Sequence, residues 1–316
     1  MNVLELEDVS ITYQNTKEAV KHVSFAVPEG RIVAIVGESG SGKSTLIRAA
    51  IGLLPAGGVI SSGRILFGEK DLAAMTAEEL RHVRGEGMAM IFQSAGDYLN
   101  PRRKVCDQYV ETLRCHQKIS KKEGYEAAKK MLATLKLPDT KHVMNAYPFQ
   151  LSGGELQRIA IARAISLHPE VLICDEATSA LDVSIQQEIM ALLKEHQDET
   201  NYAILFISHD LALVENFSQQ VVVMYLGRIV EIMNGAAFRM HARHPYTKAL
   251  LSSVFSIDDD PDKEIYVLDG EAQSATGTIT GCVFCNRCSQ AKDICRREAP
   301  VLKPIRTGHQ VACHFV

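Results

Sequence analysis

The sequence predicts an α/β fold with an antiparallel accessory sheet, a mostly helical stretch and a small cysteine-rich extension at the C-terminus. The run 31–36 (RIVAIV) is continuously apolar, as in a strand buried on both faces, and leads into a glycine-rich loop and the helix-forming segment STLIRAAIGLL. Further apolar runs of strand length occur at 170–174 and 203–207, separated by a segment with helical period. This alternation is typical of α/β architecture.

The segments around this core differ in pattern. Residues 3–13 and 20–27 alternate apolar and polar positions, which predicts half-buried antiparallel strands of the accessory sheet. The helical stretch is expected at about 95–158. The periodicity weakens after HPYTKALLSSV, and IDDDPDKE is interpreted as an exposed acidic linker before the cysteines. We therefore expect two domains, at 1–240 and 241–316.

Length and composition exclude several classes of protein. The chain of 316 residues exceeds the usual size of one domain. A net charge of -4 provides no general attraction to nucleic acid or anionic lipid. No apolar run approaches the roughly 18 residues that span a bilayer, and the N-terminal MNVLELED is not a secretory signal. We expect a cytoplasmic chain that binds no nucleic acid.

The segment 37–45, GESGSGKST, matches the pattern G-x-x-x-x-G-K-[ST] between a predicted strand and a predicted helix. Its glycines let successive backbone N–H groups turn inward, and the helix N-terminus adds positive potential where phosphates bind. Lys43 is expected to hold the β- and γ-phosphates of a nucleotide, and Ser44 to ligate Mg²⁺. The predicted nucleotide-binding residues of this loop are Gly37, Ser39, Gly40, Gly42, Lys43, Ser44 and Thr45. An ordinary glycine-rich turn explains the glycines but not Lys-Ser-Thr at the helix start.

Two carboxylates follow the second predicted buried strand. Asp175 and Glu176 come directly after an apolar run, at the strand end where ligands of parallel sheets bind. Asp175 is expected to reach the Mg²⁺ shell, and Glu176 to polarise the attacking water. His209 follows the strand AILFI in a similar way and is expected to contact the γ-phosphate. A solvated acidic cap and a hydrogen-bonded turn histidine are the alternatives for these residues taken alone.

A second potential anion site occurs at 151–158, LSGGELQR. Ser152 has the position of a helix N-cap, and Gly153 and Gly154 leave the backbone open before a helical segment. An ordinary capped helix is the alternative for this segment alone. With the first loop, one chain would carry two phosphate sites.

Together these segments resemble the ATP-binding-cassette family over about residues 3–235. GESGSGKST is similar to the Walker A motif of the family, VLICDE to Walker B and LSGGE to the signature motif. Phe92-Gln93 resembles the Q-loop, and the segment 179–182 resembles the D-loop, which ends at Asp182.

The resemblance implies an ATPase with a P-loop, RecA-like core. It also implies roles for several individual residues. His209 would be the switch histidine, and Tyr13 would stack on adenine. Gln93 would link the Mg²⁺ and water site to a membrane partner, and Asp182 would take part at the nucleotide. In this family, Walker A of one subunit and the signature motif of another enclose the same ATP, so hydrolysis requires a dimer.

The C-terminal segments HPYTKALLSSV and GCVFCNRCSQAKDICRREAPVL resemble the extension of ATPase subunits of oligopeptide, dipeptide and nickel importers. This implies an ATP-hydrolysing subunit of a peptide importer, peripheral to the cytoplasmic face of the membrane. The implied partners are two membrane permeases, an extracytoplasmic solute-binding protein, and either a homologous second ATPase subunit or a second copy of this chain. A nickel or metal-chelate importer is the alternative, followed by a redox-sensing or a DNA-associated ATPase.

Five of the eight cysteines lie between Cys282 and Cys313, which favours local ligation of a metal over a disulfide framework. Cys282, Cys285 and Cys288 have the C-x-x-C-x-x-C spacing that begins some bacterial iron–sulfur ligand runs. The resemblance to importer subunits implies Cys282, Cys288, Cys295 and Cys313 as ligands of a [4Fe–4S] cluster, with Cys285 as an additional thiol. A tetrathiolate Zn²⁺ site and unmetallated reduced thiols are the alternatives.

Overall fold

The computed structural model describes residues 1–14, 17–177, 181–253 and 280–316. The chain divides into two units. The first unit comprises Met1–Val3, Pro28–Arg31 and Ala74–Phe206, and the second comprises Leu4–Val27, Ile32–Ala73 and Ile207–Val316. The expected acidic linker IDDDPDKE lies outside the described residues.

An antiparallel sheet in the second unit confirms the expected accessory strands. Its strand order is β2-β1-β4-β5. The bounds are β1 Asn2–Tyr13, β2 Lys17–Pro28, β4 Gly58–Phe67 and β5 Lys70–Asp71. The register of β1 against β4 shifts around Asp8, whose φ is 51°. Before this bulge the strand buries the even-numbered Leu4 and Leu6, and after it the strand buries the odd-numbered Val9 and Ile11. The extra residue at the bulge thus shifts the apolar–polar alternation by one position within the strand.

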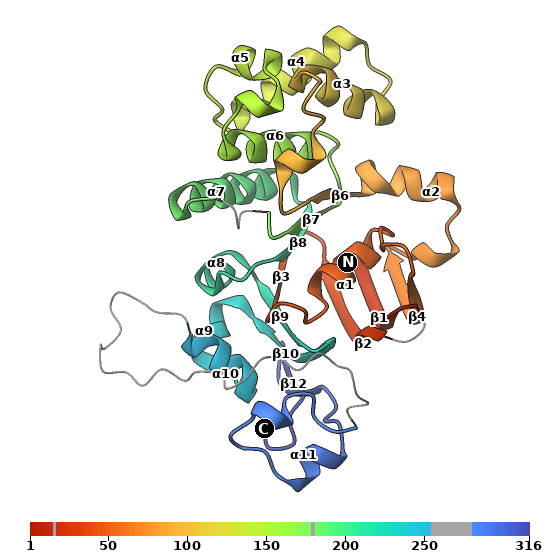
Figure 1. Cartoon of the computed structure of the whole chain (residues 1–316), viewed down its shortest axis with the longest axis vertical. Coiled ribbons are helices and arrows are strands. Elements are labelled where there is room, and N and C mark those ends of the chain that lie inside the picture. Colours follow the sequence, from red (N-terminus) through yellow and green to blue (C-terminus); the bar gives the residue numbers. More distant parts are fainter. Residues whose placement is uncertain (15–16, 178–180, 254–279) are drawn as a thin grey trace. The chain divides into compact units, whose positions relative to one another are not determined.

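A second group of strands in the second unit carries the glycine-rich loop. The strands follow one another in the order β11-β12-β10-β9-β3. Their bounds are β3 Ile32–Val36, β9 Gln220–Tyr225, β10 Arg228–Asn234, β11 Lys303–Arg306 and β12 His309–Val311. β3 is parallel to β9, and the other neighbours are antiparallel. Every residue of β3 is buried, which confirms the strand expected at 31–36. The short strands β11 and β12, which the sequence pattern did not predict, continue this sheet beyond β10 (Figure 1).

The helices of the second unit begin where the local sequence favours it. Their bounds are α1 Lys43–Ala50, α8 Leu211–Phe217, α9 Phe238–His241, α10 Pro245–Ser252 and α11 Asp293–Arg297. In α10, Pro245 occupies the first turn, where its fixed φ suits a helix. His244 caps the helix, because its Nδ1 accepts a hydrogen bond from the Tyr246 backbone N–H at 3.1 Å. Burial lowers the pKa of His244 to about 4, so the ring is neutral near pH 7 and can accept this bond.

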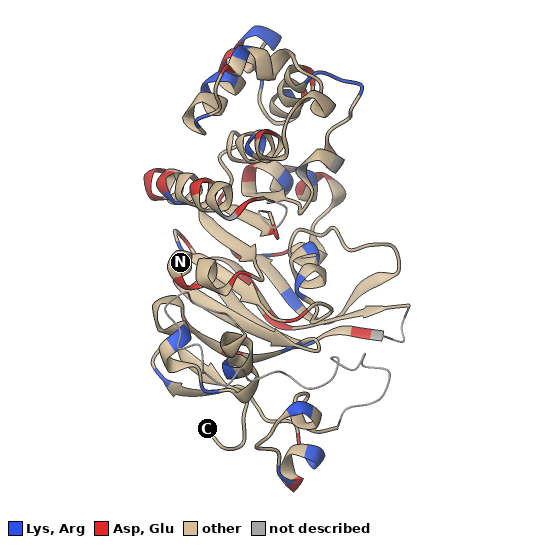
Figure 2. Ribbon diagram, turned by 60° about the vertical axis from the view of Figure 1, so that its left-hand side comes forward, with Lys and Arg blue, Asp and Glu red and all other residues tan. Residues whose placement is uncertain are grey.

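The described residues of the first unit form three strands and a helical part. The strand order is β8-β7-β6, with bounds β6 Met88–Ile91, β7 Val171–Asp175 and β8 Ala203–Ile207. The helices are α2 Ala77–His82, α3 Val105–His116, α4 Lys121–Thr134, α5 Thr140–Asn145, α6 Gly153–Ile165 and α7 Val183–Thr200. Helices α3 to α5 and the start of α6 lie within the helical stretch expected at about 95–158, whose bounds remain a prediction. Figure 2 shows both signs of charge on these helices. Among the described residues, no helix is both long and apolar enough to cross a bilayer.

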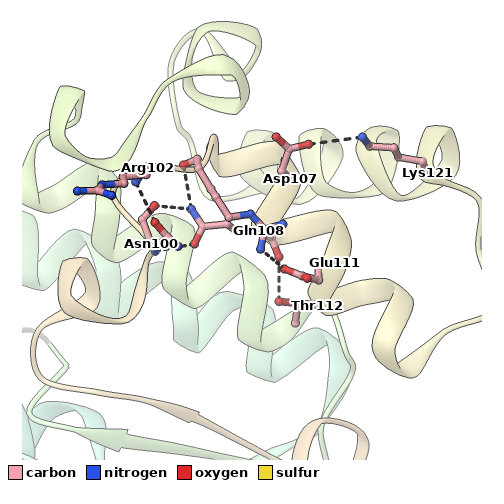
Figure 3. A network of polar contacts seen from close by, with 8 residues as sticks. Asn100, Arg102, Asp107, Gln108, Glu111, Thr112 and Lys121 are labelled. Atoms are coloured by element: carbon pink, nitrogen blue, oxygen red, sulfur yellow. Dashed lines mark hydrogen bonds and ion pairs between the residues drawn. The ribbon is translucent and has the colours of Figure 1, made fainter.

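The buried side chain of Gln108 holds the segment that precedes α3 (Figure 3). Its Oε1 accepts a hydrogen bond from the Asn100 backbone N–H at 2.7 Å. Its Nε2 donates to the backbone carbonyls of Asn100 and Arg103, both at 3.0 Å. These bonds satisfy a buried amide and fix the backbone between Asn100 and Arg103, which has no regular secondary structure.

A fully buried carboxylate joins three segments of the second unit. Glu231, on β10, has an exposed fraction of 0%. Its carboxylate accepts hydrogen bonds from the backbone N–H groups of Arg243 at 2.8 Å and His244 at 3.1 Å. The Nε2 atom of His309, on β12, lies 2.6 Å from Glu231 Oε1. Because Arg306 Nε donates to His309 Nδ1 at 3.2 Å, the Nε2 atom carries the ring proton and donates to Glu231.

We predict that Glu231→Ala lowers the stability of the chain by about 3–5 kcal/mol, because it leaves His309 and two backbone N–H groups buried without their acceptor. The matched control is Glu215→Ala, which removes a partly exposed ion pair with Arg239 of 3.1 Å and is expected to cost about 0–1 kcal/mol. Urea unfolding followed by circular dichroism measures both changes. Equal shifts of the unfolding midpoint in the two variants would contradict the role assigned to Glu231.

Candidate functional site

The loop 37–45 between β3 and α1 is shaped by glycines with positive φ. Gly37, Gly40 and Gly42 have φ values of 149°, 77° and 96°. A Cβ atom on Gly37 would lie 2.2 Å from the Met224 carbonyl oxygen, and one on Gly42 would lie 2.6 Å from the Ala19 carbonyl oxygen. Those two positions therefore exclude any side chain. At Gly40 a Cβ atom meets no described heavy atom within 4 Å, so only its φ requires glycine.

Lys43 begins α1 and is only 7% exposed. Its Nζ atom donates to the carbonyl oxygens of Gly37 at 2.7 Å and Glu38 at 2.8 Å, and lies 3.3 Å from Ser41 Oγ. The ammonium group is therefore held inside the loop, next to the N-terminus of α1, whose first-turn N–H groups have no partner within a helix. A buried positive charge beside a helix N-terminus suits a phosphate chain. Ser44 and Thr45 follow in the same turn and are partly exposed.

The Tyr13 ring lies against the neighbouring strand of the accessory sheet. Tyr13 is opposite Gly58 in the β1–β4 register, and a Cβ atom on Gly58 would lie 2.8 Å from Tyr13 Cε1. Because Gly58 has no side chain, the Tyr13 ring can lie against β4 at this position. The ring remains partly exposed. A partly exposed aromatic ring in the second unit agrees with the expected adenine-stacking role, which remains a prediction.

Two residues expected at the catalytic centre meet in the first unit. The parallel register pairs Ile91 of β6 with Cys174 of β7, so Gln93 and Glu176 both emerge two residues later at the same sheet edge. Gln93 Nε2 donates to Glu176 Oε2 at 2.9 Å. Glu176 has a φ of 49°, which is unusual for a residue other than glycine and is frequent at functional sites. Asp175, the last residue of β7, is 4% exposed.

The helix that follows LSGGE begins with a capping box. Ser152 Oγ accepts from the Glu155 backbone N–H at 3.3 Å, and Glu155 Oε2 accepts from the Ser152 backbone N–H and hydroxyl, both at 2.8 Å. A Cβ atom on Gly153 would lie no closer than 4.0 Å to Leu181, and one on Gly154 no closer than 3.5 Å to Ile185. These are ordinary contact distances. Packing within the described chain therefore does not require either glycine.

Two further expected residues lie at helix starts. Asp182 is exposed at the N-cap of α7 in the first unit. Ser179 and Ala180, which precede it in the resemblance to a D-loop, lie outside the described residues. His209 is exposed in the second unit, between β8 and α8. The next residue, Asp210, caps α8, because its carboxylate accepts from the N–H groups of Ala212 and Leu213 at 3.0 and 3.1 Å.

The five C-terminal cysteines line one cavity of about 20 Å³ in the second unit. They are Cys282, Cys285, Cys288, Cys295 and Cys313. Burial raises the pKa of Cys282 to about 11 and also raises that of Cys288, so both thiols are neutral near pH 7 unless a metal displaces their protons. Five thiols around one cavity fit the soft donor set of an iron–sulfur or Zn²⁺ site. Within the described residues, however, no group of three or more His, Cys, Asp or Glu side chains is arranged to hold a metal ion, so the ligand assignment remains a prediction.

Sequence reasoning assigned no role to Glu38 and Arg287, which form an ion pair within the second unit. The Arg287 guanidinium contacts both carboxylate oxygens of Glu38, at 2.7 and 3.1 Å. Glu38 occupies a variable position of the loop pattern, and Arg287 lies 249 residues later, so no local pattern relates them.

Two family models match this chain. Residues 20–179 match the model described as ABC transporter, and residues 230–295 match the model described as oligopeptide/dipeptide transporter, C-terminal region. A putative peptide import ATP-binding protein of Brucella ovis is 40% identical, over 98% of this chain and 97% of that protein. The oligopeptide transport ATP-binding protein of Salmonella typhimurium is 42% identical, over 94% of this chain and 88% of that protein.

The solved structures agree with the fold. A dimeric structure of a bacterial ABC transporter cassette aligns with a TM-score of 0.66 at 27% identity. The alignment covers 73% of this chain and 98% of that one. With the glycine-rich loop and the pair Gln93–Glu176 in place, the chain belongs to the ABC transporter family as one of its ATPases.

Proposed function

We propose that this chain is the ATP-hydrolysing subunit of a membrane importer for dipeptides or oligopeptides. The observation that carries the proposal is that similarity to peptide-transport ATP-binding proteins spans nearly the whole chain, including the C-terminal region characteristic of such transporters. The chain acts at the cytoplasmic face of the membrane with two permeases, a solute-binding protein and a second ATPase subunit, either a homologue or another copy.

ATP hydrolysis requires one set of groups that holds the phosphates and another that activates the attacking water. Lys43 and the N–H groups of the loop 37–45 hold the β- and γ-phosphates, and Tyr13 stacks on adenine. Ser44, Gln93 and Asp175 are the side chains that would hold Mg²⁺, which neutralises phosphate charge when bound. Glu176 takes a proton from the attacking water, and His209 contacts the γ-phosphate.

The contact between Gln93 and Glu176 supports this assignment of the base. The amide of Gln93 donates to Glu176 Oε2, which orients the carboxylate so that Oε1 can accept the water proton. Loss of the negative charge at this position removes the proton acceptor but leaves the phosphate-holding residues intact.

We expect Glu176→Gln to reduce ATP turnover by about 10²–10⁴-fold while ATP binding stays within about twofold of wild type. Uptake of a labelled dipeptide by vesicles containing the complete importer should be lost with it. Glu195→Gln, which changes an exposed carboxylate on α7 in the same way, is the control and should leave both unchanged. Wild-type turnover in Glu176→Gln refutes the base. Uptake of nickel instead of peptide by the wild-type importer would replace the proposed cargo with the metal alternative.

The open start of α6 supports a shared nucleotide. Ser152, Gly153 and Gly154 present a capped helix N-terminus for which packing within the described chain offers no reason to keep glycine. In a dimer these residues hold the γ-phosphate bound to Lys43 of the facing subunit, and Asp182 lies at the same interface.

We predict that Gly153→Asp keeps the fold but blocks ATP-dependent dimerisation. A carboxylate in the first turn of a helix is stabilising, and the site has room for it. Opposite a triphosphate, however, it should lower dimerisation and ATPase activity by at least about tenfold. Lys122→Asp places the same group in the first turn of α4, which has an equivalent capping box, and should change neither. Sedimentation with ATP measures the dimer; full dimerisation of Gly153→Asp would exclude a shared site at α6.

We further propose that the C-terminal thiols bind a [4Fe–4S] cluster through Cys282, Cys288, Cys295 and Cys313, with Zn²⁺ as the alternative. The support is their shared cavity and the donor chemistry of the set. Such a site would stabilise a segment that has few apolar positions of its own, as structural metal sites do.

Chain purified without oxygen should contain about four iron and four sulfide ions. Cys288→Ser should lower that content, whereas Cys115→Ser, an exposed cysteine outside the cavity, should not. Metal and sulfide analysis decides between the possibilities: one zinc per chain supports the Zn²⁺ alternative, and absence of both metals overturns the proposal.

A further inference from the structure

We propose that Arg287, in the cysteine segment 282–288, is a positioning residue of the phosphate loop, and that through it this segment sets the affinity of the loop for nucleotide. The inference rests on the proposed ATP-binding role of the loop 37–45. It concerns the second unit alone, which contains every residue involved.

The first step is a bidentate ion pair between the two segments. Arg287 Nη1 lies 2.7 Å from Glu38 Oε2, and Nη2 lies 3.1 Å from Glu38 Oε1. The Arg287 side chain is only 9% exposed and that of Glu38 27% exposed, so water screens this pair less than a surface pair. Arg287 Nη1 also lies 3.3 Å from the Tyr225 hydroxyl, at the end of β9. Two parallel charge-assisted bonds define both the distance and the orientation of the carboxylate.

The second step is that Glu38 is also held through its backbone. The Glu38 N–H donates to the Tyr246 hydroxyl at 2.8 Å. The Glu38 carbonyl accepts from Lys43 Nζ at 2.8 Å. Glu38 is thus fixed through its side chain, its N–H and its carbonyl, and the last of these orients the ammonium that holds the phosphates. A shift of Glu38 therefore moves an acceptor of Lys43.

The third step connects Arg287 to the cavity of the thiols. Arg287 follows Phe284 in a tight turn and donates its backbone N–H to the Phe284 carbonyl at 3.1 Å. Phe284 is 1% exposed and packs on Tyr246, Tyr225 and His244, with ring centroids 5.4, 5.3 and 5.9 Å apart. Phe284 and the cysteines on either side of Arg287 line the same cavity.

These contacts explain why an arginine stands between two cysteines. The aromatic cluster anchors the turn 284–287, and the guanidinium extends from it to the phosphate loop. A rearrangement around Cys285 or Cys288 therefore reaches the Glu38 carboxylate through Arg287. Lysine at this position would keep the charge but not the two-pronged contact.

The test measures the dissociation constant of Mg-ADP and Mg-ATP by calorimetry. Arg287→Gln and Glu38→Gln should each weaken binding by about tenfold, and the double variant should weaken it no further, because both changes remove the same pair. Arg287→Lys should fall in between. At saturating ATP the turnover number of Arg287→Gln should stay within about twofold of wild type, because the groups that activate water are elsewhere.

Arg297→Gln, an exposed arginine of α11 in the same C-terminal segment, is the matched control and should bind nucleotide as wild type does. Unchanged nucleotide affinity in Arg287→Gln overturns the proposal, and so does additive weakening in the double variant. These outcomes can be told apart from failure of the proposed function, because each variant is compared with wild type. If the proposed function were wrong, the wild-type chain itself would bind no ATP or would not support peptide uptake.

Discussion

The buried ammonium of Lys43 is the constraint on which the rest of the phosphate loop depends. A positive charge that is 7% exposed must be surrounded by acceptors, and the carbonyl groups of Gly37 and Glu38 provide them. The backbone can turn its carbonyl groups inward in this way because glycines occupy the positions with positive φ and close backbone contacts. The same turn brings the ammonium group beside the N-terminus of α1, which is the end of a helix that favours anions.

The two units contribute different chemistry. The second unit carries the loop 37–45 with Lys43, Tyr13 and His209, whereas the first unit carries the contact between Gln93 and Glu176 and the capped start of α6. This division suits an ATPase that must bind before it hydrolyses, because the groups proposed to hold phosphates and the groups proposed to activate water lie on separate segments.

The C-terminal segment is an integral part of the phosphate-binding unit. Glu231 ties β10 to the start of α10 and to β12, and Tyr246 of α10 accepts the Glu38 N–H. Together with Arg287, these contacts connect the segment with the cysteines to the loop through buried polar groups. Buried polar networks of this kind specify one arrangement, since each unsatisfied member is costly.

The sequence by itself determined the features that depend on local spacing: the buried strand at 31–36, the glycine-rich loop, Lys43 at the helix start and the capped helix after Ser152. Each follows from steric or capping rules that act over a few residues. The resemblance of these motifs to a known family extended them to a function. Only the tertiary structure decided the bulge at Asp8, the contact of Gln93 with Glu176 and the pair of Arg287 with Glu38. These depend on strand register and on packing between segments up to 249 residues apart, which local periodicity does not encode.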